Sequence, residues 1–327
     1  MKKILVTGGA GFIGSHLVKH LLNKYPKYVV VNIDSLTYAS NYEFIKDLEN
    51  NSNYSFYKLD INETDSIISL FQKYNFDSVI NLAAESHVDN SIIKPGVFAR
   101  TNILGTINLL NIANQAWSGS NYNKNVFYQI STDEVYGSLD ISGSFTEKTR
   151  YSPRSPYSAS KASADHFIFA YSHTYNLPIL ISNCSNNFGP NQHHEKLIPK
   201  VVSCLINKSK IPVYGNGSNI RDWLFVNDHI RAIDLILHNG KVGESYNIGG
   251  GNELSNLELI KQIIRIFHSN SKIADISEYI EFVDDRKGHD FRYSIDFKKL
   301  RNNLGWTPKA NFSHSLKQTI DWYRNKK

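Results

Sequence analysis

A glycine-rich turn near the start of the chain constrains its fold more than any other feature. Gly8-Gly-Ala-Gly11-Phe-Ile-Gly14 lies between the apolar run 3–7 and the segment 12–23. The first of these is typical of a buried strand, and leucines recur on one side of the second with helical spacing. Glycines in such a turn let the backbone approach a pyrophosphate, which the amides of the helix N-terminus can bind. The pattern predicts a βα unit with a dinucleotide site, although an ordinary strand-to-helix turn is the alternative.

Buried-strand patterns recur along the chain and alternate with helical patterns. They cover residues 29–33, 54–59, 78–82, 126–130 and 179–182. This alternation predicts an α/β fold with a doubly wound parallel sheet.

The second part of the chain has a different pattern. Prolines and glycines interrupt the periodicity from about residue 183 onward. We expect a nucleotide-binding domain over residues 1–182, with a return segment near 220–235, and a smaller mixed α/β substrate domain over residues 183–327.

Composition restricts the class of protein. Of 327 residues, 41% are hydrophobic and 20% are charged, which suits a globular enzyme. No stretch is long enough to predict a membrane span, and the first apolar run is too short for a signal peptide. Cys184 and Cys204 form no disulfide framework or metal-ligand spacing, so we expect a cytoplasmic protein. The net charge of +6 is spread without a basic stripe, which argues against nucleic-acid binding and favours an anionic small molecule.

Two acidic positions predict how the dinucleotide is bound. Asp34 ends the second predicted strand, where a carboxylate can accept hydrogen bonds from the adenosine ribose and repel a 2′-phosphate. The cofactor is therefore expected to be NAD. Asp60-Ile61 follows the third predicted strand and would either flank the adenine or cap the next helix.

Tyr157-Ser-Ala-Ser-Lys161 carries two reactive groups. The four-residue spacing places phenol and ammonium on one face of a helix that Pro156 begins. The ammonium can stabilise a phenolate, which makes the tyrosine a base for an alcohol. A surface pair without a catalytic role is the alternative reading.

Asp133 and Glu134 form a neighbouring pair of carboxyl groups after the strand 126–130. Consecutive side chains can address adjacent atoms, and mutual repulsion raises one pKa so that an acid and a base coexist. The pair predicts proton removal and proton donation on neighbouring carbons, and a solvated turn is the alternative. Thr132 would bind the substrate oxygen or merely end the strand.

The glycine turn and the Tyr-x-x-x-Lys pair resemble the extended short-chain dehydrogenase/reductase family of nucleotide-sugar enzymes. Within it, the chain is most similar to the 4,6-dehydratases. The motifs that carry this likeness are Leu36-Thr-Tyr-Ala39, Ala83-Ala-Glu-Ser-His-Val-Asp89, Thr132-Asp-Glu-Val-Tyr-Gly137, Ser185-Asn-Asn187, Glu195-Lys-Leu-Ile-Pro199, Arg221-Asp-Trp-Leu224 and Asp285-Arg-Lys-Gly-His-Asp290. Two departures are Phe188, where the family has tyrosine, and Asn191-Gln-His-His, where it has a more aromatic, proline-containing run.

The resemblance implies a Rossmann-type NAD enzyme that dehydrates dTDP-glucose. Tyr157, assisted by Lys161, would take the proton of the 4-hydroxyl, Glu134 would remove the proton of carbon 5, and Asp133 would protonate the departing 6-hydroxyl. UDP-glucose as the substrate, 4-epimerase chemistry, and an inactive NAD-binding sensor are the alternatives.

The resemblance also implies the binding residues and the partners. For the cofactor they are Gly8, Gly11, Phe12, Ile13, Gly14, Asp34, Ser35, Leu36, Thr37, Asp60, Ile61, Leu82, Ala83, Ala84, Thr101, Tyr157, Lys161 and Asn187. For the nucleotide-sugar they are Ser86, Thr132, Asn186, Glu195, Lys196, Leu197, Arg221, Asn256, Arg286 and His289. His193-His194 lacks a third ligand, so no metal is expected. A homodimer is expected through the helices near 101–116 and 157–175, whose apolar residues include Ile107, Leu110, Phe167, Phe169 and Tyr171.

Overall fold

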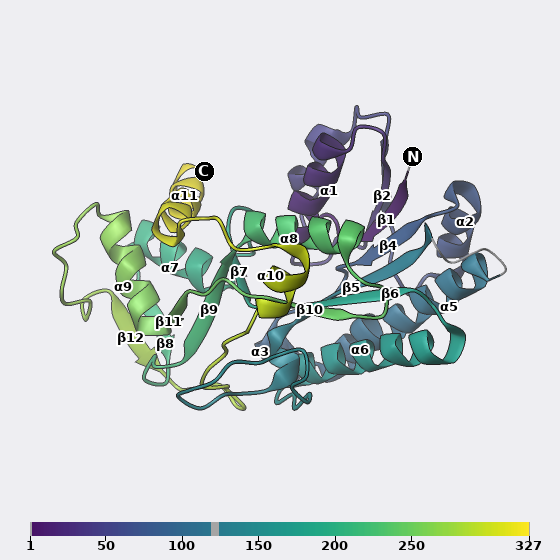
Figure 1. Cartoon of the computed structure of the whole chain (residues 1–327). Coiled ribbons are helices and arrows are strands. Elements are labelled where there is room, and N and C mark those ends of the chain that lie inside the picture. Colours follow the sequence, from purple (N-terminus) through teal and green to yellow (C-terminus); the bar gives the residue numbers. More distant parts are fainter. Residues whose placement is uncertain (1, 119–123, 327) are drawn as a thin grey trace.

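In the computed structural model, which describes residues 2–118 and 124–326, a parallel sheet forms the centre of the larger part of the molecule (Figure 1). Within these residues the sheet has seven strands, in the order β10-β6-β5-β4-β1-β2-β3. The strands are β1 (Lys3–Thr7), β2 (Val29–Asp34), β3 (Tyr54–Lys58), β4 (Ser78–Asn81), β5 (Val126–Thr132), β6 (Ile179–Cys184) and β10 (Ser245–Ile248).

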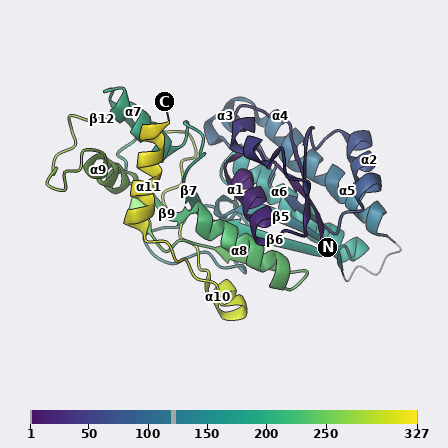
Figure 2. The same cartoon turned by 90° about the horizontal axis from the view of Figure 1, so that it is seen from above.

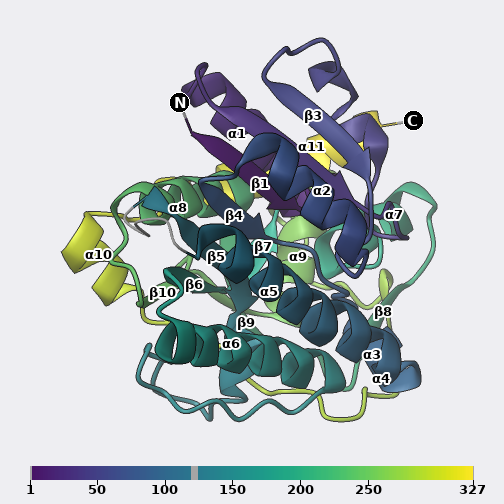
Figure 3. The same cartoon turned by 90° about the vertical axis from the view of Figure 1, so that its right-hand side faces the viewer.

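Helices cover both faces of this sheet because its strands are apolar on both sides. On β1, Ile4 and Val6 pack into one core, whereas Leu5 packs into the core on the opposite face. Different helices cover the two faces, as Figures 1 and 3 show. They are α1 (Phe12–Lys24) and α8 (Val226–Asn239) on the first face, and α2 (Thr64–Tyr74), α5 (Thr106–Trp117) and α6 (Pro156–Tyr175) on the second.

Short helical segments connect these elements. The described ones are η1 (Tyr42–Phe44), η2 (Lys46–Leu48), α3 (Val88–Ile93), α4 (Pro95–Phe98), the π-helical η3 (Ala99–Gly105) and the 3₁₀ segment η5 (Asp133–Tyr136). The helix expected near 101–116 therefore begins as a π-helical segment and continues as α5.

A smaller region lies beyond the carboxyl ends of the parallel strands, at the left of Figures 1 and 2. It contains a mixed sheet of order β11-β9-β7 and a parallel pair, β12-β8. Its elements are β7 (Asn186–Phe188), α7 (Leu197–Ile206), β8 (Ile211–Tyr214), β9 (Ile220–Phe225), β11 (Glu253–Ser255), α9 (Asn256–Phe267), β12 (Ile280–Val283) and α11 (Phe312–Asn325). Helix α10 (Lys298–Leu304) instead packs against β10 and α8 of the larger part.

The predicted doubly wound parallel fold is confirmed. β5 and β6 each extend two residues beyond their predicted ends, because Thr132 still pairs with Cys184 in the sheet. The polar residues at these strand ends hid the extension from a pattern based on apolar runs. The division of the chain at residue 182 stays a prediction, and β10, from beyond that position, completes the sheet. Among the described residues, no helix has the length and hydrophobicity needed to cross a membrane.

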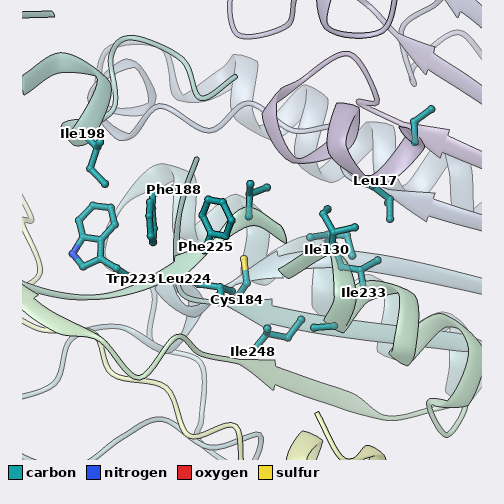
Figure 4. Packing of buried hydrophobic residues seen from close by; sticks show 14 of the residues in the cluster. Leu17, Ile130, Cys184, Phe188, Ile198, Trp223, Leu224, Phe225, Ile233 and Ile248 are labelled. Carbon is teal, nitrogen blue, oxygen red and sulfur yellow. The ribbon is translucent and has the colours of Figure 1, made fainter. Parts of the chain in front are cut away.

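One hydrophobic core continues from α1 into the smaller region. Figure 4 shows Leu17 of α1 and Ile130 of β5 at one end of this cluster and Trp223 at the other. Phe188 is 1% exposed, and its ring centroid lies 5.4 Å from that of Phe225. The phenylalanine at this position is therefore a core residue whose neighbours are aromatic.

A buried carboxylate, Asp234, joins α8 to α1. Its side chain is 3% exposed and lies within hydrogen-bonding distance of four side chains. The distances are 3.0 Å to His20 Nε2, 2.5 Å to Lys24 Nζ, 2.9 Å to Tyr25 OH and 3.0 Å to His238 Nδ1. Burial opposes ionisation, but these hydrogen bonds outweigh it and hold the pKa of Asp234 below its ordinary value.

We expect Asp234→Asn to lower the free energy of unfolding by about 2 kcal/mol at neutral pH, because a buried carboxylate with several donors is lost. Since the pKa is lowered by folding, this contribution is present above the ordinary aspartate pKa and is lost as the pH falls through the folded-state value. Urea unfolding at neutral and acidic pH measures it. Asp321→Asn, in the exposed pair with Lys317, is the control and should cost less than about 0.5 kcal/mol. Equal losses in the two variants would contradict the assignment.

Candidate functional site

A cavity opens at the carboxyl ends of the parallel strands, where ligands bind in doubly wound folds. Nearly all the predicted cofactor residues line it. They are Gly8, Gly11, Phe12, Ile13, Gly14, Asp34, Ser35, Thr37, Asp60, Ile61, Leu82, Ala83, Ala84, Thr101, Tyr157, Lys161 and Asn187. Leu36 is the exception, and its backbone N–H donates to Asp34 at 2.8 Å.

The glycine turn packs too closely to accept side chains. A Cβ on Gly14 would lie 2.2 Å from the Gly8 carbonyl oxygen, and Gly8 has a φ of +72° with the backbone of Ala83 against it. The missing side chains leave a cradle at the N-terminus of α1, whose first amides have no partner within the helix. The turn therefore has the space and the dipole that a diphosphate requires.

Two carboxylates line the part of the cavity next to β2 and β3. The Asp34 carboxylate accepts from the backbone N–H groups of Ala10 and Leu36, at 2.9 and 2.8 Å. Asp60 accepts from the backbone N–H of Asn62, whereas Glu63 occupies the N-cap of α2. The expected alternative, in which Asp60 caps that helix, is wrong because the helix begins at Thr64, four residues later.

Asp133 and Glu134 follow β5 directly and line the cavity together with Thr132. The Thr132 hydroxyl accepts from the Glu134 backbone N–H and donates to Asp133 Oδ1, both at 3.3 Å. Asp133 is 2% exposed, and its Oδ2 has no hydrogen-bond partner in the described chain. Burial, followed by the neighbouring charge of Glu134, raises the pKa of Asp133 well above its ordinary value. This carboxyl group is suited to hold a proton near neutral pH.

Glu134 has a different electrostatic environment. Burial raises its pKa, but Arg221, Lys196 and Arg286 oppose that increase. Three cations from the smaller region thus favour the ionised form of Glu134. The pair is arranged as a protonated acid next to a carboxylate that can act as a base.

Helix α6 places Tyr157 and Lys161 in the cavity. Ser155 and Ser158 form a capping box at its start, and Pro156 occupies the first turn. Lys161 Nζ donates to the Ile130 carbonyl of β5 at 2.8 Å. Burial, then the charge of Glu134, raises the pKa of Tyr157 well above 10, whereas a hydrogen bond with Thr132 lowers it. A nearby cation must therefore act on the phenol before it can serve as a base.

Some predicted substrate residues line the cavity and others lie outside it. Those inside are Ser86, Thr132, Asn186, Glu195 and Lys196. Lys196 Nζ donates to the Ser86 carbonyl at 2.9 Å, which links the start of α7 to the segment after β4.

The residues outside the cavity lining are Leu197, Arg221, Asn256, Arg286 and His289. The Arg221 guanidinium lies 4.2 Å from the Tyr293 ring centroid and donates to the carbonyls of Ile220, Asp290 and Phe291. Several of its donors are therefore already engaged by backbone.

The two other charged groups of this set lie near each other. The Arg286 guanidinium lies 5.2 Å from the Tyr214 ring centroid. His289 Nδ1 lies 2.6 Å from Asp285 Oδ1, and the charge of Arg286 helps to lower the pKa of His289 after burial. Leu197 and Asn256 are the first residues of α7 and α9.

The cavity also includes residues that the sequence analysis did not select. Examples are Glu85, Cys184, Gln192 and His193. Glu85 lies inside the motif 83–89, so its position next to Ser86 was an available signal. Gln192 and His193 belong to the segment that departs from the family pattern. In the described ranges, no group of three or more His, Cys, Asp or Glu side chains could hold a metal ion.

The chain is similar to known proteins over nearly its whole length. A model of the GDP-mannose 4,6 dehydratase family matches residues 5–319. A dTDP-glucose 4,6-dehydratase from Haemophilus influenzae is 48% identical over 99% of this chain and 98% of its own. The crystal structure of a dTDP-glucose 4,6-dehydratase from Streptomyces venezuelae, with NAD bound, has a TM-score of 0.92 and 43% identity over 99% of this chain and 97% of its own. A UDP-glucose 4-epimerase from Thermotoga maritima has a TM-score of 0.86 and 28% identity over 98% of each chain.

The burial of Asp133 in the site should lower the free energy of unfolding of the protein. Because folding raises its pKa, the folded protein loses stability as the pH rises above the ordinary aspartate value. Asp133→Asn should remove that loss. We expect the variant to be more stable than the wild type at pH above neutral, by on the order of 1 kcal/mol or more, and to gain little in acid. Urea unfolding at both pH values tests this, with the exposed Asp140→Asn as the control. No gain at high pH would be the contrary result.

Proposed function

The chain belongs to the GDP-mannose 4,6 dehydratase family, and we propose that it converts dTDP-glucose to dTDP-4-keto-6-deoxy-glucose and water. One observation supports this most strongly: the buried Asp133-Glu134 pair lines the same cavity as Tyr157 and Lys161. A group that can deprotonate an alcohol, placed next to an acid and a second base, fits oxidation followed by elimination. The dTDP-glucose 4,6-dehydratases among its relatives support the choice of glucose as the sugar and of thymine as the nucleobase.

The cavity fits NAD at its cofactor end. The cradle left by Gly8 and Gly14 would hold the pyrophosphate, and Asp34 would accept from the adenosine ribose while repelling a 2′-phosphate. When bound, NAD would accept the hydride of carbon 4 and return it to carbon 6. The carboxylate of Asp34 therefore supports NAD over NADP.

The side chains would divide the proton transfers between them. Tyr157 would take the proton of the 4-hydroxyl, with Thr132 hydrogen-bonded to its phenol. The resulting ketone would acidify carbon 5, where Glu134, whose ionised form is favoured by three nearby cations against the effect of burial, would remove a proton. Asp133, protonated because it is buried beside Glu134, would donate to the departing hydroxyl of carbon 6. Glu134 would finally return a proton to carbon 5.

Cationic side chains of the smaller region would hold the nucleotide diphosphate. Lys196, Arg221 and Arg286 supply the positive charge, and planar guanidinium groups suit bidentate contact with phosphate. Since Arg221 is engaged by carbonyls, it would contribute mainly its charge and its remaining N–H donors. Ser86, Asn186 and Glu195, which line the cavity, would contact the sugar.

Glu134→Gln tests the proposed base. In deuterated water the wild type should incorporate deuterium at carbon 5 of the product, and the variant should lose turnover by about 10²-fold or more and incorporate none. NMR of the products formed from dTDP-glucose and from UDP-glucose measures both the reaction and the preference for one nucleobase over the other. Glu281→Gln, on the exposed side of β12, is the matched control. Retained uptake of deuterium in Glu134→Gln, or conversion at carbon 4 alone, would contradict the proposal.

A homodimer is also part of the proposal. Figure 3 shows α3, α4 and α6 on the side of the molecule that faces the viewer. These helices and η3 carry exposed apolar side chains. They are Ile93 on α3, Val97 on α4, Leu104 on η3 and Phe167 on α6, with exposures of 73, 45, 57 and 40%. Exposed apolar side chains gathered on these helices fit a second copy of the chain. Leu110, named with this surface from the sequence, is instead fully buried within the chain.

Leu104→Glu combined with Phe167→Glu should convert a dimer to a monomer, because two charges would be buried between copies. Size-exclusion chromatography with light scattering measures the mass. Ile141→Glu, at a side chain that is 86% exposed on the loop before α6, should leave the dimer intact. A wild-type mass equal to one chain would overturn this part of the proposal.

A further inference from the structure

Asp165 is a buried carboxyl group that the proposed chemistry does not use. It lies four residues after Lys161 on α6, as Lys161 lies four after Tyr157, so the three side chains share one face of the helix. Asp165 is fully buried and Lys161 is 3% exposed. The ammonium donates to the carbonyl of Ile130, and Asp165 accepts from the next residue of β5, Ser131. Both charged groups therefore pack against consecutive residues of one strand.

The hydrogen bonds of Asp165 hold one carboxylate oxygen and leave the other free. Oδ2 accepts from Ser131 Oγ at 2.6 Å and from Tyr151 OH at 3.1 Å. Oδ1 has no hydrogen-bond partner within the described chain. Within the described chain, Asp165 and Lys161 form no ion pair, so the carboxylate acts on the ammonium through space rather than by direct contact. A buried carboxylate that lacks a directly contacting cation is costly to ionise.

We propose that Asp165 is a positioning residue that keeps the buried Lys161 ammonium charged beneath Tyr157. A lysine removed from water loses its proton readily, and a neutral amine cannot stabilise a phenolate. Asp165 supplies the opposite charge one helical turn away, on the side of Lys161 that faces away from the cavity. Ser131 and Tyr151 fix its carboxylate there.

The charges around these groups agree with this assignment. Burial lowers the pKa of Lys161, and Asp165 is the first group that opposes this, followed by Cys184 of β6. Burial raises the pKa of Asp165 to about 6, opposed by Lys161 and by its two hydrogen-bond donors, with a smaller contribution from His166. Besides burial, the charge of Asp165 also raises the pKa of Tyr136 and that of Tyr151. At neutral pH the carboxylate is ionised, and it loses its charge as the pH falls through about 6.

The first test follows the ionisation of Tyr157 in the NAD-bound protein without substrate. Tyrosinate absorbance of each variant, minus that of the same variant carrying Tyr157→Phe, isolates this one phenol. We expect Asp165→Asn to raise the pH at which Tyr157 ionises by about one unit, because Lys161 then loses its proton. Asp165→Glu should restore most of the wild-type value. Ser131→Ala should produce a smaller shift in the same direction.

Turnover gives the second readout and rests on the proposed function. The acid limb of the pH profile of kcat should move to higher pH together with the tyrosinate midpoint. Below that midpoint, kcat should fall about tenfold for each pH unit. If the wild type fails to convert dTDP-glucose, the proposed function fails while the tyrosinate titration still decides the role of Asp165.

Controls separate this role from a general loss of structure. Ser163→Ala, which removes only a bond to the Ala159 carbonyl of the same helix, should leave both profiles unchanged. If Asp165→Asn does not fold, Ser131→Ala and Asp165→Glu decide the matter. An unchanged or lower midpoint for Tyr157 in folded Asp165→Asn, or no upward shift in Ser131→Ala, would overturn the proposal.

Discussion

The hydrogen bond from Lys161 Nζ to the Ile130 carbonyl connects the two elements on which the site depends. It holds α6, which carries Tyr157, against β5, which ends at Thr132 and continues directly into Asp133 and Glu134. Because β5 lies inside the parallel sheet, its carboxyl end is rigid and opens into the cavity. The phenol and the two carboxyl groups thus keep a fixed relation that neither element could impose alone.

Burial gives these groups their chemical character. Asp133 is pushed towards its protonated form, Glu134 is held nearer its ionised form by cations from the smaller region, and Tyr157 is left dependent on a nearby cation. Each of these states costs folding free energy. The large cores on both faces of the sheet offset that cost, and Asp234 adds a stabilising cluster on the face away from α6. The site therefore consists of titratable groups whose burial is unfavourable and is made possible by the stability of the surrounding fold.

The parts of the site that could be predicted from the sequence are those with local signals. The glycine turn, Asp34 at the end of β2, and the Tyr157-Lys161 spacing each depend on a few neighbouring residues, and all of them line one cavity. Arg221 and Arg286 were named through resemblance, but their engagement with backbone carbonyls and with Tyr214 depends on folding of distant segments.

Asp165 and the burial of Leu110 escaped prediction for a related reason. A single acid within a helix has no pattern of its own, and its significance arises from Ser131 and Tyr151, which the fold brings to it. Leu110 has the spacing of an interface residue, yet it packs into the core on one face of the sheet and is completely buried within the chain. Helical periodicity identifies apolar faces, whereas tertiary packing decides what covers each of them.

In the proposed reaction, the hydride removed from carbon 4 stays in the cavity and returns to carbon 6 of the same sugar. Incubation with dTDP-glucose carrying deuterium at carbon 4, followed by NMR of the product, measures this directly. We expect the deuterium to be recovered at carbon 6 of the product, with none released to solvent. Deuterium that remains at carbon 4, or that appears in free reduced cofactor, would contradict it.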